Sequence, residues 1–113
     1  MEIITNILES GKLKEMAVQT FGNLIKAVVD VDRGLLALDG ELHSDLEVLL
    51  PENGSKQKNL LGINLYPDMQ GEDFIEFDSI INMRPSQDNR SRGVEDKELH
   101  KKIIEIVNKR IKR

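Results

Sequence analysis

The chain has 113 residues, of which 39% are hydrophobic and 32% are charged, and its formal net charge is −4. This composition excludes an intrinsically disordered chain, and no apolar run approaches the roughly 20 residues of a membrane-spanning helix. The lack of cysteine excludes disulfides and thiolate chemistry, and the N-terminus has no secretory signal pattern. We therefore expect a single cytoplasmic domain over residues 1–113, without membrane association.

Charge is unevenly distributed along the chain. Residues 1–83 hold 6 basic and 15 acidic side chains, a net charge of −9, whereas residues 84–113 hold 10 basic and 5 acidic, a net charge of +5. Such asymmetry is typical of a basic arm for nucleic acid, but also of a terminal helix with a solvated lysine face, which we favour. The chain has three Phe, one Tyr and no Trp, so few side chains can stack on bases, which argues against a nucleic-acid partner.

The first amphipathic pattern predicts a helix over residues 10–22, after a short strand at Glu2 to Ile4. Leu13, Met16 and Ala17 recur at helical spacing behind Ser10, a residue type that favours the N-cap. Gly22 offers a left-handed stop at the end of the helix.

A β-hairpin is predicted next. Apolar residues alternate over 25–31, and Asp32-Arg33-Gly34 is typical of a three-residue loop with glycine at the left-handed position. The return strand over 35–43 then directs alternate residues to opposite faces. Leu36, Leu38 and Leu42 lie on one face, and Glu41 and His43 on the other.

The remaining chain contains two further helices, two strands and a long loop. Ser44 and Glu47 fit a capping box for a helix over 44–50 that Pro51 ends, and strands are predicted over 61–66 and 75–84. The segment 84–94 has no regular period and is predicted to be a loop. Asp96 is expected to cap a last helix that runs to the C-terminus.

These elements predict an α+β fold with a mixed or mostly antiparallel sheet of four to five strands. Because each strand carries an apolar face, we expect two layers, with all three helices packed on one face of the sheet. The other face is then expected to be open and polar. By side-chain parity it carries Lys26, Asp30, Glu41, His43, Asn64, Tyr66, Asp78, Asn82 and Arg84.

The loop after the last strand has the composition of an oxyanion site. Arg84, Arg90 and Arg92 lie within nine residues and alternate with polar residues that include Ser86 and Asn89. Guanidinium groups form charge-assisted hydrogen bonds with carboxylates and phosphates. An equally weighted interpretation is a flexible surface loop whose arginines pair with the acidic part of the chain.

Two other interpretations use the acidic residues and the histidine near residue 43. Glu41, His43 and Asp45 have ligand-type side chains, but the chain has only two histidines and a structural metal site usually takes four ligands, so we expect no metal. A small hydrolase or metal-dependent enzyme using His43, Glu41 and Asp78, with Ser79 or Ser86 as nucleophile, is the alternative function. A structural homodimer formed through the open sheet face is a third hypothesis.

Several motifs resemble a small prokaryotic family known as a domain of unknown function. They are Lys26-Ala27-Val28-Val29-Asp30, Gly40-Glu41-Leu42-His43, Gly62-Ile63-Asn64-Leu65-Tyr66-Pro67 and the run Arg84-Pro85-Ser86-Gln87 followed by Asn89-Arg90-Ser91-Arg92-Gly93-Val94-Glu95-Asp96. The resemblance covers about residues 12–107 and implies no particular activity. Its polar motif residues are those that parity places on the open face and the adjoining loop.

The leading hypothesis is a small soluble binding domain of unknown activity, without a cofactor. The open sheet face and the arginine-rich loop would hold an anionic small molecule or an acidic protein partner. The candidate binding residues are Arg84, Ser86, Asn89, Arg90, Arg92, Asn64, Tyr66, Asn82, Asp78, His43 and Glu41.

Overall fold

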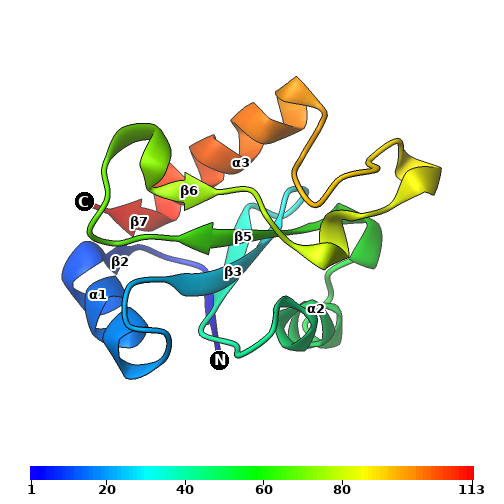
Figure 1. The fold of residues 1–113 in the computed structure, drawn as a ribbon. Helices are drawn as coiled ribbons and strands as arrows, with labels where there is room; N and C mark the ends of the chain where they lie inside the picture. Colours follow the sequence, from blue (N-terminus) through cyan, green and yellow to red (C-terminus); the bar gives the residue numbers. More distant parts are fainter.

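The structure, a computed structural model, describes residues 1–113 and is built on a five-stranded sheet with the strand order β1-β4-β3-β5-β6 (Figure 1). All four neighbouring pairs in it are antiparallel. A separate parallel pair joins β2 to β7, near the two ends of the chain. The strands are β1 (Glu2–Ile4), β2 (Leu8–Glu9), β3 (Ile25–Asp30), β4 (Leu35–Leu38), β5 (Leu60–Leu65), β6 (Ile75–Glu76) and β7 (Ile111–Lys112).

Three α-helices accompany the sheet: α1 (Ser10–Gln19), α2 (His43–Glu52) and α3 (Lys97–Arg110). The predicted α+β class, the mostly antiparallel sheet and the strand at Glu2–Ile4 are therefore confirmed. No helix combines the length and the apolar character that crossing a lipid bilayer requires. Short 3-10 turns lie at Gln57–Asn59, Gly71–Asp73, Ile80–Asn82 and Pro85–Gln87.

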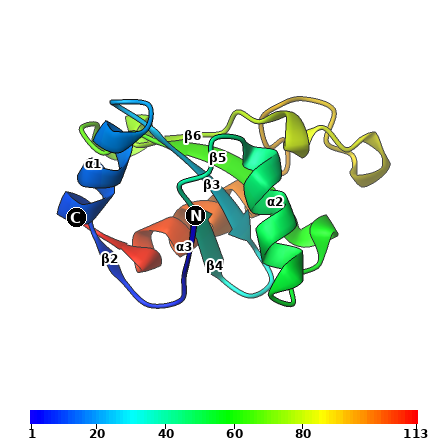
Figure 2. The ribbon, with the colours of Figure 1, turned by 90° about the horizontal axis from the view of Figure 1, so that it is seen from below.

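The prediction that all three helices cover one face is wrong for α2. The larger apolar cluster joins Ile25, Ala27 and Val29 of β3 to α1 and α3, whereas the smaller one joins Val28 to Leu46 of α2. Successive residues of a strand point to opposite faces, so α2 lies across the sheet from the other two helices. Figure 1 shows α3 above and α2 below the strands β3 and β5, and Figure 2 shows α2 from below. The hairpin strands are apolar on both faces and are therefore covered on both.

The hairpin loop forms as predicted, with Gly34 at a φ of 67°. Asp30 stabilises the loop, because its carboxylate accepts hydrogen bonds from the backbone N–H groups of Asp32 at 2.9 Å and Arg33 at 3.0 Å. Asp30 is fully buried. The prediction that it lies on an open polar face is therefore wrong.

The helix ends differ from the expected ones, except at the start of α3; this helix ends at Arg110 instead of running to the C-terminus. The Asp96 carboxylate caps α3 as predicted, but Ser10 is the first residue of α1 and does not cap it. Helix α2 begins one residue before Ser44, with the Asp45 carboxylate accepting from the Leu42 N–H at 3.3 Å, and it continues through Pro51 to Glu52. Short-range patterns locate a helix to within a residue or two, which is not enough to assign a cap.

The predicted strand over 75–84 forms only as the two-residue β6. After Glu76, side-chain hydrogen bonds to β5 replace the backbone hydrogen bonds of a strand pair. The Asn82 side chain accepts from the Gly62 N–H at 2.7 Å and donates to the Gly62 carbonyl at 2.9 Å. Asn82 is fully buried and bonds β5 as a strand residue would. The parity that placed Asn82 on an open face therefore does not apply beyond Glu76.

Candidate functional site

A cleft of about 280 Å³ opens on the α2 side of the sheet. It lies between the N-terminus of α2, the middle strands and the segment that follows β6. Helix α2 covers the part of this face around Val28, and the cleft occupies the part around Asn64. The polar side chains that line it are Lys26, His43, Ser44, Asn64, Asp78 and Arg92, with Ser79 at its base.

Gly62 lets two side chains close over the strand at the base of the cleft. A Cβ atom at Gly62 would lie 2.6 Å from the Ser79 Cβ and Oγ atoms and 3.1 Å from His43 Cδ2. Ordinary carbon contacts are about 3.5–4.0 Å, so only glycine fits here without a shift. Because Gly62 has no side chain, His43 and Ser79 can both pack against it, although they are far apart in sequence.

His43 is buried and held in one orientation. Its Nε2 atom lies 2.8 Å from the Ile63 carbonyl oxygen, and since a carbonyl only accepts, Nε2 carries the proton. Burial lowers the pKa of His43 below 6.5, and the charges of Lys26 and Arg92 lower it further, against the opposing effects of the Ile63 bond and Asp78. The ring is therefore neutral at pH 7, with Nδ1 as a hydrogen-bond acceptor.

Asn64 stands in a polar row across three strands, opposite Lys26 of β3 and Glu76 of β6. Its Nδ2 atom donates to the Glu76 carboxylate at 2.9 Å and to the Asp78 carbonyl at 3.4 Å. Its Oδ1 atom is buried and has no hydrogen-bond partner. An unsatisfied buried acceptor costs about 1–3 kcal/mol, which a donor supplied by a ligand would offset.

Tyr66 lies at the edge of this row rather than in the cleft. Its hydroxyl donates to the Glu76 carboxylate at 3.0 Å. Desolvation and the adjacent Glu76 raise the pKa of the Tyr66 phenol. Tyr66 therefore positions Glu76, which in turn holds the Asn64 amide.

Two cationic side chains flank the cleft, and both have hydrogen-bond donors without a partner in the protein. Arg92 donates from Nε to the Asp78 carboxylate at 2.7 Å and makes no other side-chain hydrogen bond, so its terminal nitrogens are free. Lys26 has no carboxylate partner, and its ammonium lies 5.4 Å from the Phe21 ring centroid. The first N–H groups of α2, at His43 and Ser44, lack intrahelical partners, and no side chain caps them.

Arg84, by contrast, stabilises the fold outside this cleft. It donates to the Glu47 carboxylate at 2.8 Å and to the Leu60 carbonyl at 2.7 Å, and both charged side chains are largely buried. The pair fastens the start of the loop to α2 and β5. The two terminal nitrogens of Arg84 are thus already bonded to partners within the fold, and only Nε makes no hydrogen bond.

The rest of the loop is organised mainly by its own side chains. Asn89 donates to the carbonyls of Asn82 and Gly93 at 2.6 and 2.8 Å, and its Oδ1 accepts from the Glu95 N–H at 2.9 Å. The Glu95 carboxylate accepts from the Arg90 backbone N–H, while the Arg90 side chain is exposed and makes no ion pair. Ser86 is exposed on the short 3-10 turn. Of the three loop arginines, only Arg92 reaches the cleft.

The residues proposed for metal binding and hydrolysis are only partly brought together. His43 and Asp78 line the cleft, but Glu41 lies in an exposed bend outside it, and His, Asp and Glu side chains form no group of three suited to an ion. The Ser79 Oγ atom accepts from the Ile81 N–H at 3.3 Å, and the proton of His43 Nε2 goes to Ile63. No serine–histidine hydrogen bond forms.

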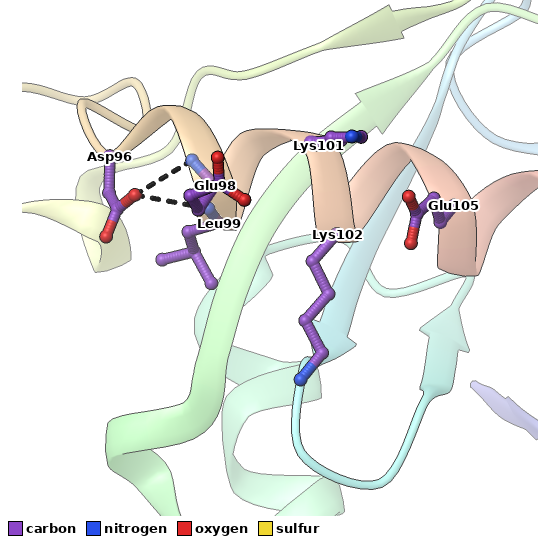
Figure 3. A pocket seen from close by; sticks show the side chains of 6 residues that line it. All are labelled: Asp96, Glu98, Leu99, Lys101, Lys102 and Glu105. Carbon is purple, nitrogen blue, oxygen red and sulfur yellow. Dashed lines mark hydrogen bonds between the residues drawn. The ribbon is translucent and has the colours of Figure 1, made fainter.

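A second hollow, of about 480 Å³, lies along the outer face of α3 (Figure 3). Its charged side chains come from one exposed face at and after the start of the helix and include both signs, as in Glu98 and Lys102. Asp96 is already engaged by the Glu98 and Leu99 N–H groups at 2.9 and 3.3 Å, which Figure 3 shows as dashed lines. This surface is typical of a solvated helix rather than of a binding site.

Sequence reasoning assigned Lys26 to the polar face but did not select it for the site, and it missed Ser44 as a lining residue. The parity of β3 was the signal for Lys26, since it stands directly opposite Asn64 in the register. The sequence pattern around Ser44 indicates only a helix cap.

Fold and cleft together define a small α+β protein with one face of its sheet divided between a covering helix and a polar, ligand-sized cleft. The chain belongs to the family described as protein of unknown function (DUF5674), whose model matches residues 2–110. The resemblance to a family of this kind is thereby confirmed. The comparisons with curated proteins and with solved structures gave no match.

Proposed function

We propose that the protein binds a small anionic molecule in the cleft between α2 and β5. The observation that carries the proposal is the unpaired, buried Oδ1 of Asn64 in a cleft flanked by Lys26 and Arg92. The positive charges of Lys26 and Arg92 would attract an anion. The unpaired Oδ1 of Asn64 would accept a hydrogen bond from a donor on the ligand. Both requirements point to a polar ligand.

The electrostatics of the cleft support this proposal. Asp78 neutralises part of the Arg92 charge but also fixes the guanidinium, leaving its terminal N–H groups to form a charge-assisted pair. The free N–H groups at the start of α2 add weaker donors. The neutral His43 adds no charge to the cleft.

A binding role is favoured over hydrolysis because the cleft offers ligand contacts but no activated nucleophile. A hydrolase needs its serine hydroxyl within hydrogen-bond reach of a base, and the Nε2 atom of His43 is occupied by Ile63. Four expectations from the sequence stay predictions: a homodimer formed through this face, a cytoplasmic location, a prokaryotic source and a single-domain organisation.

The test is a calorimetric titration with small carboxylates and phosphate monoesters. We expect binding to the unchanged protein and to Arg90→Ala, a matched loss of an exposed arginine outside the cleft. A Lys26→Ala, Arg92→Ala double variant should bind at least about tenfold more weakly, since each charge-assisted hydrogen bond contributes roughly 1.5–3 kcal/mol. Equal binding by the double variant, or no binding of any anion by the unchanged protein, would refute the proposal.

A further inference from the structure

We infer that the ligand of this cleft is a monoanionic carboxylic acid with a hydroxyl or amide donor next to its carboxylate and an apolar chain beyond it. This inference rests on the proposed function and names the class of its ligand. Three features of the cleft carry it: its small net charge, the position of Asn64 and the apolar side chains at its rim.

The charge of the cleft matches a carboxylate better than a phosphate. Lys26 and Arg92 are positive, Asp78 is negative and His43 is neutral, which leaves one net positive charge. Glu76, hydrogen-bonded to Asn64, adds a further negative group at the edge. With Glu76 counted, the charges of the cleft sum to zero, so a dianionic phosphate would add two uncompensated negative charges and a single carboxylate only one.

The Asn64 acceptor stands next to the place for the carboxylate. Lys26 and Asn64 are direct partners in the register of β3 and β5, and such partners have Cβ atoms about 4.5–5.5 Å apart. The side chains of Lys26 and Asn64 therefore start side by side in the cleft, and a ligand that engages both needs an anionic group for Lys26 and a hydrogen-bond donor for Asn64 Oδ1. A hydroxyl or N–H on the carbon beside a carboxylate supplies both groups in one small molecule.

The rim of the cleft is apolar and exposed. Leu42, directly before α2, and Ile80, after β6, both line it, with exposed fractions of 56% and 69%. Burying these two side chains against a hydrocarbon chain would remove apolar surface from water. A purely polar ligand would leave them exposed.

The experiment is a calorimetric series of sodium salts: acetate, 2-hydroxypropanoate, hexanoate and 2-hydroxyhexanoate, with inorganic phosphate and 1-hexanol as comparisons. We expect 2-hydroxyhexanoate to bind most tightly, with affinity rising about two- to fourfold per methylene group of the chain. Hexanoate, which lacks the hydroxyl, should bind several-fold more weakly. In Ile80→Ser the dependence on chain length should fall, whereas Val48→Ser, an equally exposed apolar residue of α2 outside the cleft, should retain it.

The outcomes separate this inference from the proposed function. Equal affinities for acetate, hexanoate and 2-hydroxyhexanoate, or tighter binding of phosphate than of the carboxylates, would overturn the ligand class and leave anion binding intact. Failure of every anion to bind would overturn both. Binding of 1-hexanol as tight as that of 2-hydroxyhexanoate would also overturn both, because the carboxylate would then contribute nothing.

Discussion

Gly62→Ala should destabilise the protein, because the added methyl group has no free space at the base of the cleft. Its carbon would lie 2.6 Å from Ser79 Cβ and Oγ and 3.1 Å from His43 Cδ2. Ser79 cannot easily retreat, since its backbone N–H donates to the Arg92 carbonyl at 2.9 Å. Overpacking of this kind costs typically about 1–3 kcal/mol. At about 4 °C per kcal/mol for a domain of this size, Tm should fall by roughly 4–12 °C.

Urea unfolding of four variants, Gly62→Ala, Gly11→Ala, Ser79→Gly and the Ser79→Gly, Gly62→Ala double variant, measures this effect. Gly11→Ala is the matched control, because a Cβ there meets nothing within 4 Å, and it should leave stability unchanged or raise it by up to about 1 kcal/mol. Introducing Gly62→Ala into a Ser79→Gly background should cost less than in the unchanged protein, since the two closest atoms are gone. A Gly62→Ala protein as stable as the original would refute the packing at the base of the cleft.

Three further predictions concern electrostatics and capping. Arg84→Met should lower the free energy of unfolding by about 2–4 kcal/mol, because Glu47 is left largely buried without its partner, whereas Arg90→Met should change it by less than about 0.5 kcal/mol in the same urea assay. The pKa of His43 is lower in the folded protein than in the unfolded chain, so stability should be fully retained above pH 6.5 and decrease as pH falls below it. Unfolding at about pH 7.5 and about pH 5.5 should show this loss in the unchanged protein but less of it in His43→Gln; an equal loss in both would contradict the assignment. Asp96→Ala should cost about 1 kcal/mol in thermal unfolding, with Asp96→Asn close to the unchanged protein, and no loss would show that the cap is dispensable.

Short sequence patterns correctly predicted the elements that are stabilised by interactions between residues close in sequence. The hairpin loop and the Asp96 cap depend on residues within four positions of each other, so the sequence shows them directly. The strand β3 was also found, because its alternation is regular. What alternation did not reveal was that Val28, Ala37 and Leu60 form a second apolar face, which α2 then covers.

The site was predicted as a region rather than as a set of contacts. Parity placed Lys26 and Asn64 on one face, and the cleft contains both; Asp78 also lines the cleft, although the strand on which its predicted parity rests ends at Glu76. The long-range partners were not visible: no local rule pairs Arg84 with Glu47, 37 positions away, or Asn82 with Gly62, 20 positions away. These bonds explain why much of the arginine-rich motif stabilises the loop instead of lining the cleft.

The most direct measurement is a ¹⁵N-resolved NMR titration of the unchanged protein with 2-hydroxyhexanoate. The account predicts saturable shifts of the Ser44 amide and the Asn64 side-chain amide, both at the cleft, with the Lys101 amide on the far helix α3 unaffected. Shifts centred on α3 or on Arg90, with Ser44 and Asn64 unchanged at saturation, would contradict it.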